Sequence, residues 1–176
     1  MYAAKPTRFN MKRSTYRNVL ALPLHFFIAT VMLPSPLQAA SLAYYGFEFD
    51  LRQDGQHAAI ISYEYLDGPR VLKSRFPDSY TNADGLGVED FSALMPRGTK
   101  LHVKWRDTST REVFEDTAML DEKLPKDVSN KIISLMIRGR QLQVFLTSTN
   151  MPHVPGTPVI GPSLYRSHVT VQIYPS

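Results

Sequence analysis

Residues 100–107 decide the fold class, and they read Lys-Leu-His-Val-Lys-Trp-Arg-Asp. In an extended chain Leu101, Val103 and Trp105 share one face, while charged and polar residues occupy the other. This period-two alternation is typical of a β-strand with one face on a core and the other in water. We therefore expect Trp105 to be a core anchor, because it shares its face with two aliphatic side chains.

Comparable runs recur along the chain from residue 45 onward. Residues 131–137 are apolar on both faces, which favours a central strand covered on both sides. The other runs alternate, and turn-rich segments separate them. The pattern predicts a mainly β, antiparallel, sandwich-like domain with one or two short helical turns near Val88–Leu94 and Pro125–Lys131. About seven strands are expected, at residues 45–52, 57–66, 100–107, 111–118, 131–137 and 141–147, and in a final run that places Val169, Val171 and Ile173 on one face before Pro175.

The first two of these strands are expected to form a β-hairpin. Asp54-Gly55 lies between them and supplies the positive φ angles that a tight turn requires. In the second strand the alternation places Ala59, Ile61, Tyr63 and Tyr65 on one face.

The N-terminal segment has the order of a secretory signal peptide. Lys12, Arg13 and Arg17 precede an apolar run at residues 19–33, and prolines and small residues follow it. The run has about 15 residues, whereas a membrane-spanning helix needs about 20. Cleavage is therefore expected at Ala39 or Ala40, which divides the chain into a leader at residues 1–39 and a single mostly-β domain at residues 40–176. Met11 is an alternative start to Met1.

The charge distribution argues against a nucleic-acid partner. The whole chain has a net charge of +4, with 20 basic and 16 acidic residues. Five of the basic residues precede Ala40, so 15 remain against 16 acidic residues in the expected domain. A near-neutral domain lacks the extended basic field that binds phosphate backbones. The absence of cysteine leaves no thiol for a lipid anchor, so no stable membrane anchor is expected after cleavage.

No catalytic, metal or cofactor motif is found in the sequence. None of His57, His102, His153 and His168 lies two to four residues from another histidine, the spacing that holds a metal on one element. Adjacent acid pairs such as Glu115-Asp116 face opposite sides of a strand and cannot form a carboxylate dyad. We therefore predict no catalytic residue, no metal ligand and no cofactor.

Two long segments, residues 75–98 and 148–167, are predicted as loops that bind a protein. They are rich in Pro, Gly, Ser and Asn and carry scattered aromatic residues, and loops of this length are often functional. Aromatic residues and arginine dominate binding hot spots. The alternative is that these aromatics pack back onto the sheet. The residues expected to contact a partner are Phe76, Tyr80, Phe91 and Arg97 in the first loop and Tyr165 and Arg166 in the second.

Several short motifs resemble a family of small exported proteobacterial proteins. They are Met95-Pro96-Arg97-Gly98, Val103-Lys104-Trp105-Arg106, Phe114-Glu115-Asp116, Leu124-Pro125, Leu142-Gln143-Val144-Phe145-Leu146 and Ile173-Tyr174-Pro175. Members of the family are uncharacterised and often accompany type VI secretion effector genes, and many are lipoproteins. This chain departs from them because it has no cysteine.

The resemblance implies a periplasmic binder, such as an immunity or accessory protein whose partner is a secreted toxin effector. We expect an exported protein-binding domain that is not an enzyme. Two alternatives stay open at this stage: a periplasmic hydrolase-type enzyme built from residues distant in sequence, and an envelope structural component.

The exported protein is predicted to begin at or within a few residues of Ala40, because cleavage-compatible small residues cluster there. N-terminal sequencing of the protein recovered from the periplasmic fraction tests this expectation. Recovery of an intact N-terminus from that fraction would contradict it.

Overall fold

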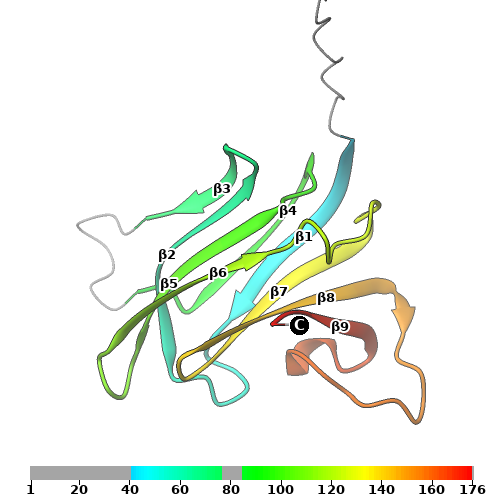
Figure 1. The fold of residues 1–176 in the computed structure, drawn as a ribbon. Coiled ribbons are helices and arrows are strands. Elements are labelled where there is room, and N and C mark those ends of the chain that lie inside the picture. The colour runs from blue at the N-terminus through cyan, green and yellow to red at the C-terminus, as the bar shows by residue number, and fades with distance from the viewer. Residues whose placement is uncertain (1–40, 77–84, 176) are drawn as a thin grey trace, which may run out of the picture. The chain divides into compact units, whose positions relative to one another are not determined.

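The computed structural model of the chain describes residues 41–76 and 85–175, which belong to one compact unit, Gln38–Ser176. These residues form nine strands and one short 3-10 turn (Figure 1). The expected leader, residues 1–39, lies outside the described residues. Within the described part of the chain, no helix is long and apolar enough to cross a membrane. The elements are β1 (Leu42–Asp50), β2 (Ala58–Asp67), β3 (Arg70–Arg75), β4 (Val88–Pro96), β5 (Lys100–Asp107), β6 (Val113–Met119), β7 (Lys131–Arg138), β8 (Gln141–Pro152), η1 (Ser163–Tyr165) and β9 (His168–Tyr174).

The strands form two sheets, as the sequence predicts for a sandwich-like domain. Sheet A has the order β4-β1-β7-β8-β9, and sheet B has the order β3-β2-β5-β6. Neighbours are antiparallel except for β1 and β7, which pair in parallel. Each of the two sheets supplies buried side chains to one apolar cluster.

The alternation of residues 100–107 is confirmed. Leu101, Val103 and Trp105 are fully buried in the core cluster, while the residues between them are half-buried. The Trp105 indole also donates a hydrogen bond from Nε1 to the backbone oxygen of Gly139, at 3.1 Å. The ring therefore has both the apolar surroundings and the polar partner that a buried indole requires.

The expected opening hairpin is wrong. Asp54 and Gly55 do have positive φ angles, of 59° and 66°. However, β1 pairs with β4 and β7 in sheet A, whereas β2 pairs with β3 and β5 in sheet B. The turn thus carries the chain from one sheet to the other. The residues of this turn suit a hairpin within one sheet and a crossing between two sheets equally well, so the sequence of the turn does not distinguish the two connections.

A β-bulge corrects the expected inward face of β2. The register of β2 against β5 shifts between Ile60 and Ser62. Ile60, not Ile61, is therefore fully buried, and the inward alternation resumes at Tyr63 and Tyr65. An extra residue in one strand reverses the faces on either side of it, and the plain period-two pattern cannot show this.

Two further expectations about the loops need correction. Residues 88–96, expected to be loop or helical turn, form β4, which pairs with β1 over its whole length. Residues 125–131 contain no helical turn, and the short 3-10 turn instead falls at Ser163–Tyr165, inside the second expected loop. That loop is also shorter than expected, because β8 continues to Pro152.

The central strand β7 is covered on both faces, as predicted. Residues 133–137 are all buried. One face contributes to the core, and the segment after β8 packs over part of the other. There the backbone nitrogen of Ser163 donates to Asp54 at 3.0 Å, and Tyr165 donates a hydrogen bond to Glu48 on β1. Burial raises the pKa of the Glu48 carboxyl, and the hydrogen bond from Tyr165 opposes that shift.

Replacement of Trp105 by alanine is expected to lower the free energy of unfolding by about 3 to 5 kcal/mol, because it empties a large core site. Trp105→Phe keeps most of the apolar contact but leaves the Gly139 carbonyl without its donor, so a smaller loss is expected. Denaturant unfolding of both variants measures the effect. An unchanged midpoint and slope for Trp105→Ala would contradict the assignment of Trp105 to the core.

Candidate functional site

The candidate site is the corner where the chain leaves β4 of sheet A and enters β5 of sheet B. A buried hydrogen-bond chain fixes this corner. The Gly98 backbone nitrogen donates to the Tyr65 hydroxyl at 2.9 Å, and the Tyr45 hydroxyl donates to the Pro96 carbonyl at 2.6 Å. The two hydroxyls lie 2.9 Å apart. Because Tyr45 uses its only proton on Pro96, Tyr65 donates to Tyr45.

Gly98 is required at this corner for steric reasons. A Cβ at this position would collide with the ring and hydroxyl of Tyr65. Desolvation raises the pKa of both tyrosines, so the hydroxyls stay protonated and the hydrogen-bond chain stays intact at ordinary pH. The corner is thus held by satisfied polar groups that link a residue of sheet A with a residue of sheet B.

Arg97 lies at this corner and is half-buried. Its Nη1 donates to the backbone oxygen of Leu124 at 2.8 Å and to that of Pro125 at 3.4 Å. These bonds tie the β4–β5 corner to the connection between β6 and β7, and they fix the plane of the guanidinium. Arginine is suited to this arrangement because its other donors stay available in a fixed geometry.

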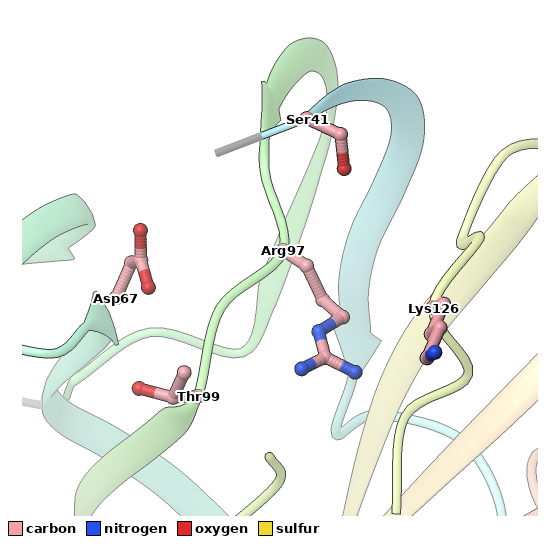
Figure 2. A pocket seen from close by; sticks show the side chains of 5 residues that line it. All are labelled: Ser41, Asp67, Arg97, Thr99 and Lys126. Carbon is pink, nitrogen blue, oxygen red and sulfur yellow. The ribbon is translucent and has the colours of Figure 1, made fainter. Parts of the chain in front are cut away.

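Beside Arg97 is an open hollow of about 300 Å³, which we call the Arg97 hollow. Figure 2 shows the guanidinium of Arg97 in the middle, Lys126 on one side and Asp67 with Thr99 on the other. The lining residues are Ser41, Asp67, Arg97, Thr99 and Lys126.

The charged groups of the Arg97 hollow are not neutralised by each other. Among the described residues, no carboxylate oxygen lies within 4.0 Å of the side-chain nitrogens of Arg97 or Lys126. Likewise, no lysine, arginine or histidine nitrogen of the described residues lies within 4.0 Å of the Asp67 carboxylate. The Thr99 hydroxyl is already engaged, because it accepts from the Gly68 backbone nitrogen at 3.0 Å and lies 3.4 Å from the Leu66 oxygen. The hollow therefore offers two cations and one anion to a solute.

Exposed apolar side chains lie next to the corner, on the outer face of sheet A. Leu42 pairs with Pro96, and Tyr44 pairs with Leu94, at the end of sheet A where β1 begins and β4 ends (Figure 1). Tyr44 is 61% and Leu94 is 63% exposed. We call the group of Leu42, Tyr44, Leu94 and Arg97 the β1–β4 end.

The predicted partner-binding residues that the structure describes do not form one group. Phe76 is 58% exposed at the end of β3, while Tyr80 lies outside the described residues. Tyr165 is buried, and Arg166 next to it is exposed, with its Nε donating to the Ser163 oxygen at 3.1 Å. Arg97 lines the Arg97 hollow.

Phe91 packs back onto the sandwich. It lies on β4, opposite Phe47 of β1, and the two ring centroids are 5.5 Å apart. The Lys73 ammonium lies 4.7 Å from the centre of the Phe91 ring. Lys73 and Arg75 also contact the Glu89 carboxylate, at 3.7 and 3.4 Å. Phe91 is therefore part of a contact between the edge strands β3 and β4.

The histidines and carboxylates of the described residues do not form a metal-ligating cluster of three or more. His153 and His168 line a separate hollow of about 220 Å³ with threonines and aliphatic residues. His102 shares a hydrogen bond of 2.9 Å with Thr117. Ser163 lies in the 3-10 turn, with its hydroxyl 3.5 Å from Gln53.

Sequence reasoning missed most of the site. Lys126 and Asp67 reach the Arg97 hollow from segments far from Arg97 in the chain, and no local pattern connects them. Tyr44 had a usable signal, because the alternation Tyr45, Phe47, Phe49 extended backward places Tyr44 on the outward face. Comparison with protein families, with curated proteins and with solved structures finds no match to this chain.

Tyr65→Phe is expected to lower the free energy of unfolding by about 1 to 3 kcal/mol, because it removes the short 2.9 Å acceptor of the buried Gly98 amide and leaves only the longer contact to the Tyr45 hydroxyl at 3.4 Å. Tyr44→Phe is the matched control, since it removes the hydroxyl of an exposed tyrosine and should change stability by less than about 0.5 kcal/mol. Denaturant unfolding measures both changes. Equal, small changes would show that the hydrogen-bond chain does not stabilise the corner.

Proposed function

We propose that the mature domain is an exported protein-binding domain that contacts its partner through the β1–β4 end. The observation that carries this proposal is the placement of exposed Leu42, Tyr44 and Leu94 beside Arg97 on a fixed corner. Tyrosine and arginine are enriched among residues that dominate protein interfaces. An apolar group bordered by charged residues is also the usual composition of such a surface.

The rigidity of the corner supports binding at this place. Tyr44 and Leu94 are opposite each other in a paired ladder, and the Tyr45–Tyr65 hydrogen bonds hold the residues that follow Leu94. Little conformational entropy is then lost when a partner orders these side chains. A flexible loop would lose more.

Export and the class of partner are parts of the same proposal. The leader-like order of residues 12–36 supports secretion to the periplasm, and the near-neutral charge of residues 40–176 favours a protein over a nucleic acid as partner. The resemblance of Met95-Pro96-Arg97-Gly98 and the other motifs supports an immunity or accessory role toward a type VI secretion effector. Phe76, Tyr80 and Arg166 stay predicted contributors.

Tyr44→Ala and Leu94→Ala are each expected to weaken partner binding by about 1 to 2 kcal/mol while stability stays within about 0.5 kcal/mol of the parent protein. The partner is the protein retained from periplasmic extract by the immobilised mature domain, and its affinity is then measured with purified components.

Met119→Ala serves as the matched control, because Met119 is 56% exposed on β6 of sheet B and lies outside the β1–β4 end. Its affinity should equal that of the parent. Equal affinities for all four proteins, or retention of no protein at all, would contradict the proposal.

A further inference from the structure

We propose that the Arg97 hollow binds a single carboxylate group of the protein partner, supplied by an aspartate or glutamate side chain or by a chain end. This inference rests on the proposed protein-binding function and names the chemistry of one contact. It follows from the two cations and one anion that line the hollow without pairing with one another.

Arg97 is already oriented for such a ligand. One of its nitrogens, Nη1, is occupied by the Leu124 and Pro125 carbonyls, and within the described chain Nε and Nη2 have no hydrogen-bond partner. Guanidinium nitrogens on one edge match the two oxygens of a carboxylate. Since the protein already holds the guanidinium plane, binding costs less side-chain entropy than it would at a free arginine.

The balance of charge selects a monoanion. Arg97 and Lys126 supply two positive charges, and Asp67 supplies one negative charge on the opposite side of Arg97 (Figure 2). A carboxylate brings the total to zero, whereas a phosphate dianion brings it to −1 and faces repulsion from Asp67. Ser41 adds a hydroxyl that points into the hollow from the start of the described chain.

The size and openness of the Arg97 hollow suit one side chain or one chain end. Its volume is about 300 Å³, and it is open to solvent. The β1–β4 end begins with Leu42, directly after Ser41, and includes Arg97 itself. Ser41, which lines the hollow, directly precedes Leu42, so the hollow and the β1–β4 end adjoin at the start of β1.

The test uses the processed domain and three short acetylated peptides as probes. One carries a single glutamate and an amidated end, one carries a free C-terminal carboxylate and no acidic side chain, and one carries neither group. Binding is followed by the NMR shifts of the Arg97 Nε–H and the Gly98 amide. We expect at least one carboxylate peptide to shift both signals with saturation, which identifies the source, and the neutral peptide and inorganic phosphate to bind more weakly.

Charge variants then establish that the binding occurs in the Arg97 hollow. Lys126→Gln should weaken carboxylate binding about three- to tenfold, and Asp67→Asn should strengthen it about two- to fivefold, because they remove attraction and repulsion respectively. Lys123→Gln is the matched control, since Lys123 is an exposed lysine of the same connection that does not line the hollow. All these effects should diminish at high salt.

The outcomes separate this inference from the proposed function. If a partner binds and depends on Tyr44 and Leu94, but no carboxylate peptide shifts Arg97 and Lys126→Gln equals Lys123→Gln, the carboxylate inference is wrong and the proposed function stands. If carboxylate peptides bind with the expected dependence on charge but no protein is retained, the proposed function is wrong. Phosphate binding at least as tight as carboxylate binding would also overturn the inference.

Discussion

The hydrogen-bond chain from Gly98 through Tyr65 and Tyr45 to Pro96 holds together the two sheets at the place where the chain crosses between them. A hydroxyl buried without a partner destabilises a protein, so each member of the chain depends on the next. The position of Gly98 allows no side chain, because the Tyr65 ring occupies that space. The direction of Arg97, which lies inside this short segment, is a consequence of that packing.

Polar contacts outside the apolar core also hold parts of the domain together. At the β3–β4 edges Glu89 accepts contacts from Lys73 and Arg75, and its side chain is only 10% exposed. Charges on the inward face of edge strands discourage the addition of further strands. Over the outer face of sheet A, Glu48 and Asp54 bind the segment around Ser163. In this chain, which has no cysteine, these contacts supplement the core in place of disulfides.

The pairing of charged groups elsewhere in the domain explains why function is proposed at the β4–β5 corner. Several cations and carboxylates of the described residues pair within the fold, as Arg52 does with Asp50 and Arg140 with Glu112. At the Arg97 hollow the charges are held in place without such partners, and exposed apolar residues lie beside them. Charged groups that are held in place but have no ion-pair partner can interact with a binding protein at little cost in side-chain entropy.

The sequence by itself determined the β class, the buried face of residues 100–107 and the covered central strand at residues 131–137, because side-chain alternation and its loss are local properties. The tertiary structure alone decided which strands pair. The Asp54-Gly55 turn fits a hairpin and a crossing equally well, and the bulge at Ile61 reverses a face without leaving a pattern in the sequence. The Arg97 hollow likewise required the fold, because Asp67, Arg97 and Lys126 meet only after distant segments pack together.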